Sequence, residues 1–219
     1  MAVKIRFLTS VFRFLNLLRS EKIQFTFTIS IPDWLAGPFV ALVLLYRRIR
    51  YGYPFRRIPL TRGKYAIVDP KHYERLNKYK WQAGKSSSSG TFYAARSVWD
   101  KVNKKKRTIK MHREIINPPY PLVVDHINHN GLDNRKANLR PATKSQNNIN
   151  KPYKKKKGAH SKYHGVTLEK RINKWQAQIR INGKHKIIGY YNDEIEAAKE
   201  YDNAARKFHG EFAVTNFDP

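Results

Sequence analysis

Apolar and polar side chains alternate most regularly in the C-terminal quarter of the chain. Between residues 174 and 181 every second side chain is apolar, which is the period of a strand with one packed and one polar face. Asn182 and Gly183 then predict a tight hairpin turn into the strand KHKIIGYY. From Asp193 onward an apolar stripe at helical spacing predicts a covering helix, formed by Ile195, Ala198, Tyr201, Ala205 and Phe208. The segment 162–219 is therefore expected to form a three-stranded antiparallel sheet packed on one helix.

The middle of the chain shows shorter patterns. KYAIVDPKHYERLNKYKW predicts a strand, a break at Pro70 and a short helix. TFYAARSVW and TIKMHREI alternate and predict two strands, joined by a lysine-rich turn at 103–107 and preceded by a loop tip at 84–90. Four further segments predict the order strand, loop, strand, helix: PLVVDHI, NHNGLDNRKAN, LRPAT and KSQNNINK. With the C-terminal sheet, these elements indicate an α+β fold.

The first 60 residues are basic and apolar, and their role stays open. The run from Trp34 to Tyr46 has thirteen residues, which is shorter than the roughly 20 that a membrane-spanning helix needs. Extending it back to residue 26 brings in Asp33 and Pro32, and the run already contains Pro38. Membrane association of residues 26–46 is therefore disfavoured, and it predicts that deleting the first 50 residues would restore solubility. A signal peptide is disfavoured because no small-residue cleavage site follows. A leader segment, or a start codon placed too early, would also account for this composition.

Charge points to a polyanionic partner. The formal net charge is +28, from 44 lysines and arginines against 16 acids. Thirty-four of these 44 basic residues precede residue 158. Double-stranded DNA is the leading candidate, and an anionic lipid surface is the alternative. The absence of cysteine excludes disulfides, thiolate zinc sites and cysteine nucleophiles.

Charge and composition also divide the chain. Residues 151–161 have the composition of a linker, with a lysine tract, a proline and a glycine. They separate a domain at 61–150 from a domain at 162–219, after the extension at 1–60. In the last domain the basic residues lie on the predicted strands and the acidic ones on the predicted helix. We expect DNA contacts, rather than only a solvated face, from Lys170, Arg171, Lys174, Gln176, Gln178, Arg180, Lys184 and Lys186, and from the linker residues Lys154, Lys155, Lys156 and Lys157.

The segment from Asp125 to Asn147 carries candidate chemistry. Phosphodiester hydrolysis needs a water molecule deprotonated near neutral pH, and an imidazole suits that work, so His126 is the predicted general base. The side-chain oxygens of Asp125 and Asn147 are hard ligands for a divalent ion, expected to be Mg²⁺ with Mn²⁺ as the alternative. The amide oxygen of Asn138 can accept the N–H of the second imidazole nitrogen. His112 is expected to pack in a strand, with a phosphate or metal contact as the alternative.

These residues resemble the ββα-metal site of HNH nucleases. Asp125, His126, Asn138 and Asn147 carry the resemblance, and with MHREI and KYAIVDP the segment 62–150 looks like the HNH homing-endonuclease group. The resemblance implies the same roles for these four residues, as metal ligands, base and base-orienting amide. Asn147 departs from the histidine that many relatives carry at its position. The alternative is an Asn-rich loop that contains an Asp-His pair by chance and has no catalytic role.

A second resemblance covers the C-terminal domain. YHGV, KWQAQIR and EAAKEYDNAARKFHGEFAVTNF are similar to the Apetala/ethylene-response-factor DNA-binding domain. The chain departs from plant members at His164, Gln178 and Ile187, whereas Arg180 matches an arginine that usually contacts bases. A plant target sequence therefore does not carry over to this chain.

Together these patterns predict a metal-dependent DNA endonuclease of the homing or mobile-element type. The C-terminal domain would hold the target while the ββα-metal core nicks it or makes a double-strand break. One site per chain favours nicking by a monomer, and no obligate protein partner is evident. We expect a cytoplasmic location, with the nucleoid if the source is prokaryotic. The alternative is a DNA-binding transcriptional regulator whose HNH-like fold is catalytically inactive.

Overall fold

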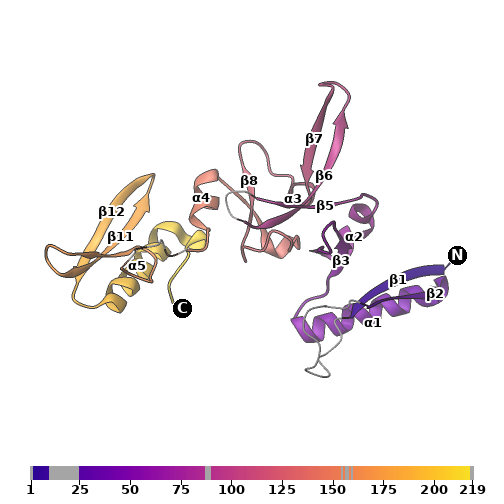
Figure 1. Ribbon diagram of the computed structural model, residues 1–219, viewed down its shortest axis with the longest axis horizontal. Helices are drawn as coiled ribbons and strands as arrows, with labels where there is room; N and C mark the ends of the chain where they lie inside the picture. The colour runs from indigo at the N-terminus through magenta and orange to yellow at the C-terminus, as the bar shows by residue number, and fades with distance from the viewer. Residues whose placement is uncertain are drawn as a thin grey trace, which may run out of the picture. The chain divides into compact units, whose positions relative to one another are not determined.

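The computed structural model describes residues 2–9, 25–86, 90–153, 155, 158 and 160–217. The chain divides into two compact units, Met1–Arg56 and Arg57–Pro219, and their elements are labelled in Figure 1. Three residues of the predicted basic linker, Lys154, Lys156 and Lys157, lie outside the described residues.

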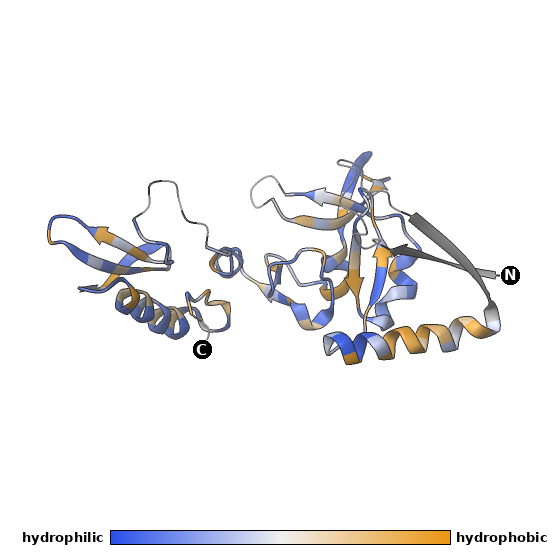
Figure 2. Cartoon of the chain, turned by 60° about the horizontal axis from the view of Figure 1, so that its bottom comes forward, coloured by the Kyte–Doolittle hydropathy of each residue, from blue (hydrophilic) through white to orange (hydrophobic). Residues whose placement is uncertain are grey.

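The first unit is a hairpin followed by a helix. Strands β1 (Ala2–Thr9) and β2 (Phe25–Pro32) pair antiparallel, and α1 runs over Asp33–Tyr51. The apolar run from Trp34 to Tyr46 therefore lies in α1, and its extension back to residue 26 lies in β2. Hydrophobic residues colour much of α1 and hydrophilic ones its C-terminal end (Figure 2). Among the described helices, none has both the length and the apolar character needed to cross a membrane.

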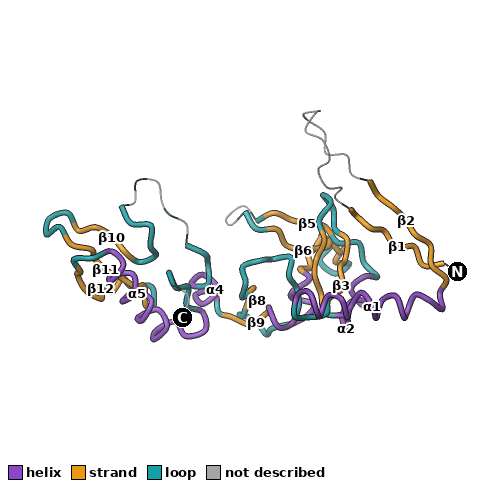
Figure 3. The backbone as a smooth tube through the Cα atoms, turned by 90° about the horizontal axis from the view of Figure 1, so that it is seen from below, coloured by secondary structure: helices purple, strands orange, loops and turns teal. Residues whose placement is uncertain are grey.

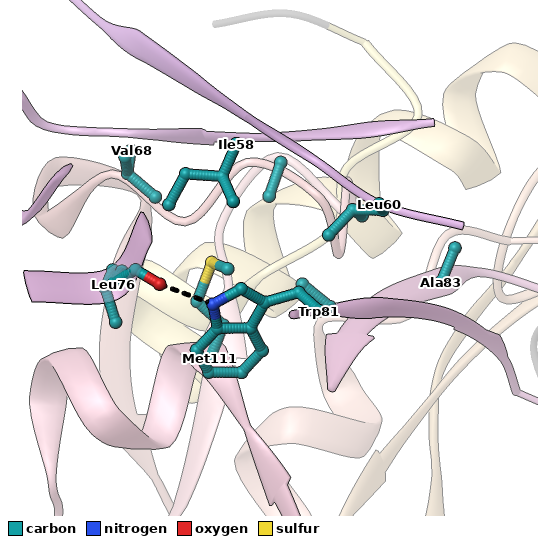
Figure 4. Close-up of a cluster of buried hydrophobic side chains, with 9 residues drawn as sticks. Ile58, Leu60, Val68, Leu76, Trp81, Ala83 and Met111 are labelled. Carbon is teal, nitrogen blue, oxygen red and sulfur yellow. Dashed lines mark hydrogen bonds between the residues drawn. The ribbon is translucent and has the colours of Figure 1, made fainter. Parts of the chain in front are cut away.

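The second unit begins with a small mixed core. Its elements are β3 (Arg56–Pro59), β4 (Tyr65–Val68), α2 (Pro70–Asn77), β5 (Gln82–Lys85), β6 (Phe92–Asp100), β7 (Lys105–Lys110) and α3 (Met111–Ile116). Ile58, Leu76, Trp81 and Met111 are among its buried side chains (Figure 4). The indole Nε1 of Trp81 donates a hydrogen bond to the Leu76 carbonyl oxygen at 2.8 Å, so the one polar atom of this large side chain is satisfied.

The predicted strand TIKMHREI is wrong in its second half. Pairing of β7 with β6 ends at Lys110, opposite Ala95, and Met111–Ile116 forms α3. Met111 and Ile115 are four residues apart, so a helix places both on one face, and both pack in the core. The strand, proline and short helix predicted for residues 64–81 are confirmed, with Pro70 in the first turn of α2.

The predicted order strand, loop, strand, helix is confirmed. Strands β8 (Val123–His126) and β9 (Leu139–Ala142) pair antiparallel, with the short helix η1 (Lys136–Asn138) before β9 and α4 (Lys144–Ile149) after it. Thr143 starts α4 by a capping box: its hydroxyl accepts from the Gln146 N–H at 3.1 Å, and the Gln146 side chain accepts from the Thr143 N–H at 2.8 Å.

The C-terminal domain is the predicted three-stranded antiparallel sheet packed on a helix, which confirms the α+β class. The sheet order is β10 (Val166–Glu169), β11 (Lys174–Ile181), β12 (Lys184–Tyr191), followed by α5 (Glu194–His209) and η2 (Gly210–Phe212) (Figure 3). Asn182 and Gly183 both have positive φ, 49° and 80°, as the tight hairpin turn requires. Asp193 caps α5 by accepting from the Glu196 N–H at 2.9 Å.

The packed face of this domain is narrower than the predicted stripe. Ala198, Tyr201 and Ala205 are buried on the sheet, but Ile195 and Phe208 are 45% and 44% exposed. The sheet therefore covers only the middle of the helix.

Candidate functional site

Asp125 and His126 end strand β8 in a cavity of about 830 Å³. Side chains from β6, β7, α3 and α4 complete its wall, including Tyr93, His112 and Asn147. Asp125 and His126 are only 4% and 6% exposed. The cavity therefore brings together Asp125, His126 and Asn147, three of the four predicted chemical residues.

The Asp125 carboxylate is held from two sides. Arg140 lies directly opposite it on β9 and donates from Nε to Oδ2 at 2.9 Å. Asn150, at the C-terminal end of α4, donates from Nδ2 to Oδ1 at 3.0 Å and to Oδ2 at 2.9 Å. The same amide also donates to the His126 carbonyl oxygen at 3.1 Å.

Neither Arg140 nor Asn150 was identified from the sequence. Asn150 carried a signal, because it lies three residues after Asn147 and so near the same side of α4.

His126 is a neutral imidazole at neutral pH. Burial lowers its pKa to about 4, although Asn134, Asp125 and Asp133 each act to raise it. Its Nε2 is buried and has no hydrogen-bond partner among the described residues. A neutral imidazole that lines a cavity and has an unpartnered nitrogen can accept a proton.

The predicted bond from Asn138 to the imidazole is wrong: no hydrogen bond joins Asn138 to His126 among the described residues. Instead its Oδ1 accepts from the Asn128 backbone N–H at 2.9 Å, and its Nδ2 donates to the Asp133 carbonyl oxygen at 2.8 Å. The reason is that Asn138 is the last residue of η1 and lies against the loop that follows β8. Two backbone groups of that loop, the Asn128 N–H and the Asp133 carbonyl oxygen, take its side chain as their partner. Asn138 thus fixes the shape of the loop.

Asn134 is the amide beside the imidazole. It is fully buried and acts to raise the pKa of His126, although its Oδ1 and Nδ2 make no hydrogen bond within the described residues. Strand β4 places it there, because the Ile67 N–H donates to the Leu132 carbonyl oxygen at 2.8 Å and the Asn134 N–H donates back to the Ile67 carbonyl oxygen at 2.7 Å. In the sequence, Asn134 carries no signal beyond those of its neighbouring loop asparagines.

Gly131 lets the loop close against β6. A β-carbon there would lie 2.5 Å from the Phe92 carbonyl oxygen and 2.6 Å from the Tyr93 ring, so any larger residue would push the loop away. The Tyr93 ring lies 5.7 Å from that of His126.

His112 lies next to His126, and the prediction that it belongs to a strand is wrong. It lies in the first turn of α3 instead of a strand, and its ring is 5.1 Å from the His126 ring in a perpendicular arrangement. It is 5% exposed, and its Nδ1 has no hydrogen-bond partner among the described residues. Burial and the nearby His126 lower its pKa to about 3. The cavity therefore contains two neutral imidazoles.

Basic side chains from three elements also line the cavity. Arg107 and Lys110 come from β7, Arg113 from α3, and Lys151 follows α4. None of these four was among the predicted DNA contacts.

The sheet of the C-terminal domain separates the predicted DNA contacts into two faces. Residues paired directly across antiparallel strands point to the same side. Gln178 and Arg180 pair with Ile187 and His185, on the face away from the buried Ile179. Lys174 pairs with Glu169, next to the pair Gln176 with Thr167 on that same outer face.

Lys184 and Lys186 do not share this outer face. They pair with Ile181 and Ile179, which pack toward α5, and the Lys186 Nζ lies 5.5 Å from the centre of the Phe208 ring on α5. Lys170 and Arg171 are exposed beyond the end of β10, and Lys155 is exposed in the linker.

Some outer-face residues already have partners within the chain. Arg180 donates from Nε to the Gly183 carbonyl oxygen at 3.0 Å. Gln176 donates from Nε2 to the Tyr190 hydroxyl at 3.1 Å, and Arg171 pairs with Glu169 at 3.1 Å. Exposed bonds of this kind contribute little free energy, so a ligand can replace them easily.

Comparison with known proteins identifies the part of the chain that contains the cavity. A family model described as HNH endonuclease matches residues 116–149. An uncharacterized HNH endonuclease of Acanthamoeba polyphaga mimivirus is 31% identical over 155 residues, which is 71% of this chain and 76% of the relative. The chain belongs to the HNH endonuclease family. The residues matched by the family model include β8, β9 and all of α4. They therefore contain Asp125, His126, Asn138 and Asn147, but not His112.

Similarity to plant proteins covers a smaller part of the chain, about a quarter of its length. APETALA2-like protein 2 of Oryza sativa subsp. indica is 48% identical over 61 residues, and an ethylene-responsive transcription factor of Arabidopsis thaliana is 47% identical over 60 residues. Each match spans about a quarter of this chain (27% and 26%) but only 14% of the plant protein. The C-terminal region is thus homologous to a DNA-binding region of the plant factors, and the remainder of those proteins has no counterpart in the match.

HNH nucleases typically use a divalent metal ion, and the oxygen atoms of this cavity fit one. The described residues contain no group of three or more His, Asp or Glu that could hold a metal. A carboxylate has about four lone-pair positions, and the three hydrogen bonds to Asp125 leave room for one more contact. The half-buried Asn147 lines the same cavity and has no side-chain hydrogen bond within the described residues. Carboxylate and amide oxygens are the ligands that Mg²⁺ and Mn²⁺ accept, with water and phosphate in the other positions.

Proposed function

We propose that this chain is a metal-dependent DNA endonuclease of the homing or mobile-element type, which acts as a monomer and nicks double-stranded DNA. The observation that carries the proposal is the pairing of a neutral imidazole with two oxygen ligands in one cavity. His126 offers an unpartnered Nε2, while Asp125 and Asn147 lie in the same wall. An Asn-rich loop formed by accident has no reason to enclose all three.

His126 is the proposed general base. Its Nε2 takes a proton from a water molecule, the water oxygen forms a bond to phosphorus, and the bond from phosphorus to the 3′ oxygen breaks. The leaving oxygen takes a proton from solvent. Because burial keeps the pKa of His126 at about 4, nearly every molecule has the base ready at neutral pH.

Asp125 and Asn147 are the proposed ligands of the ion, with Mg²⁺ the first choice and Mn²⁺ the alternative. A bound divalent ion would supply positive charge against the charge that develops on the phosphate and the leaving oxygen. Arg107, Lys110 and Arg113 add fixed positive charge around the same cavity, which favours the approach of a phosphate backbone.

The C-terminal domain is the proposed target-holding part. Its Arabidopsis relative is a transcription factor, and its outer face presents Lys174, Gln176, Gln178 and Arg180. Lys154, Lys155, Lys156 and Lys157 are proposed to follow the phosphate backbone between the domains. Tethering a sequence reader to a cutter that reads little sequence raises the effective concentration of one site.

Relaxation of supercoiled plasmid tests the proposal. The full chain with Mg²⁺ or Mn²⁺ should convert supercoiled plasmid to nicked circles, and EDTA should stop the conversion. His126→Ala should lower the rate by about 10²- to 10⁴-fold, the usual contribution of a general base. The matched control is His160→Ala, which removes an exposed histidine of the linker and should cut at the parent rate.

Binding without cleavage would overturn the nuclease proposal. If the parent binds plasmid tightly but leaves it supercoiled with either metal, the chain is a DNA-binding regulator with an inactive HNH fold. Cleavage that is equal in His126→Ala and in the parent would instead remove His126 from the chemistry.

A further inference from the structure

Arg140 touches both the proposed metal ligand and the C-terminal domain. From β9 its Nε donates to Asp125 Oδ2 at 2.9 Å, while its Nη1 donates to the Glu211 carbonyl oxygen at 2.7 Å. The centre of the Phe212 ring lies 3.7 Å from the guanidinium carbon. Both ends of this contact belong to the compact unit Arg57–Pro219, although 71 residues separate Arg140 from Glu211.

The contact is buried on both sides. Arg140 is 9% exposed and Phe212 5% exposed, and the α4 helix that carries Asn147 also contacts η2. The Glu211 carboxylate contributes little, because it is 3.4 Å from Nη1 and its side chain is 73% exposed. The backbone carbonyl of Glu211 and the Phe212 ring are therefore the contacts that hold the guanidinium, as a cation held against an aromatic face.

Without its contacts to Glu211 and Phe212, Arg140 would no longer hold the Asp125 carboxylate in one position. An arginine side chain has many rotamers, and only the arrangement seen here brings Nε to Asp125 Oδ2. Removing the contacts on its far side would let the guanidinium turn toward water and release the carboxylate, which would then be held by Asn150 alone. A group that orients a metal ligand from behind commonly changes metal affinity by about 10- to 100-fold.

We propose that Gly210–Phe212 is a positioning element of the nuclease site: it holds Arg140, which holds the metal ligand Asp125. The nuclease site is then complete only when the end of the DNA-reading domain is docked on β9. Nothing in the family match extends to this segment, since that match ends at residue 149. The inference rests on the proposed function in one respect, the assignment of Asp125 as a metal ligand.

Metal affinity without DNA tests the inference. Titration of the full chain with Mn²⁺, followed by the electron paramagnetic resonance signal of free Mn²⁺, gives a dissociation constant that does not depend on cleavage. Phe212→Ala should raise this constant about tenfold. Phe212→Tyr keeps the aromatic face and should stay within about twofold, whereas Phe212→Leu keeps the apolar volume without the ring and should fall between, at about threefold.

Phe208→Ala is the matched control. Phe208 is a phenylalanine four residues earlier, is 44% exposed, and lies against Lys186 and Lys207 instead of Arg140. Its removal should leave Mn²⁺ affinity unchanged. Circular dichroism and DNA affinity of each variant show whether the C-terminal domain still folds. If Phe212→Ala does not fold, the comparison of Phe212→Leu with Phe212→Tyr decides.

Asp125→Ala separates failure of this inference from failure of the proposed function. If Asp125→Ala leaves Mn²⁺ binding unchanged, the metal assignment is wrong and the inference fails with it. If Asp125→Ala abolishes binding while folded Phe212→Leu and Phe212→Tyr bind Mn²⁺ equally, the metal site stands and the positioning role of Gly210–Phe212 is overturned.

Discussion

The cavity of the HNH core and the outer face of the C-terminal sheet hold their polar side chains under opposite conditions. In the cavity region, Asp125, His126 and Asn138 are at most 6% exposed, and Asp125 and Asn138 are hydrogen-bonded within the chain. On the sheet, Lys174 and Arg180 are exposed to solvent.

This difference follows from what each region is proposed to do. A proton acceptor and metal ligands must be held in one geometry before the substrate arrives, and burial in an organised polar network achieves this. A surface that reads DNA gains more from exposed side chains that exchange water for phosphate and base contacts. Removing a polar side chain from the cavity should therefore lower the stability of the fold. Removing one from the outer face of the sheet should lower only the affinity for DNA.

Asn138→Ala should give the largest effect on stability. It leaves the Asn128 N–H and the Asp133 carbonyl oxygen without their partner, and a buried unsatisfied polar group costs about 1–3 kcal/mol. We expect the free energy of unfolding to fall by about 2–4 kcal/mol, measured by urea denaturation. Gln178→Ala, an amide truncation on the outer face of the sheet, should cost less than about 0.5 kcal/mol.

Kinetics decide whether Asn138 has a chemical role as well. Measured at a temperature where the variant is folded, Asn138→Ala should keep most of the nicking rate once its loop is formed. Full stability with a large loss of rate would restore the predicted role, in which Asn138 orients the imidazole.

The sequence predicted the cavity region well where local pattern decides. The β8, loop, β9 and α4 order follows from short apolar runs and turn-forming residues, and the offsets from Asp125 to Asn147 follow from the family resemblance. What it missed depends on long-range placement. Asn134 is held near His126 because β4, far earlier in the chain at Ile67, binds the backbone of the loop, and no local pattern contains those bonds.

Residues of the sheet and of α3 show the same dependence on long-range placement. Lys184 and Lys186 are predicted as DNA contacts from their charge alone, whereas pairing with Ile181 and Ile179 sets the face on which they lie. His112 is predicted in a strand because Ile109 and Met111 alternate with polar residues, and packing of Met111 and Ile115 on the core selects the helix.

Acid should destabilise the cavity region. Burial lowers the pKa of His126 to about 4 and that of His112 to about 3, so below pH 6.5 the unfolded chain binds protons that the folded chain does not. Stability is therefore lost as the pH falls from 6.5. Between pH 7.5 and 5 the loss is about 2 kcal/mol for each histidine.

Urea denaturation at pH 7.5 and pH 5 measures this dependence. His126→Gln and His112→Gln should each reduce the loss of stability between the two pH values by about 2 kcal/mol, whatever their stability at pH 7.5. Lys174→Ala, on the exposed sheet, should keep the full dependence of the parent. A variant of either histidine with the same pH dependence as the parent would show that the imidazole is not held neutral by burial.

The smallest effect separates the two faces of the sheet. Lys174 lies on the outer face, whereas Lys186 lies on the face of α5 with its Nζ 5.5 Å from the Phe208 ring. If the outer face contacts the phosphate backbone, Lys174→Ala should reduce the slope of the logarithm of DNA affinity against the logarithm of salt concentration by about 0.9, the value for one phosphate contact. Lys186→Ala removes the same charge from the same sheet, so it is the matched control and should change the slope by less than about 0.3. Equal changes in the two variants would mean that the lysine side chain at residue 186 reaches DNA around the strand edge, and that charge, not strand register, selects the contacts.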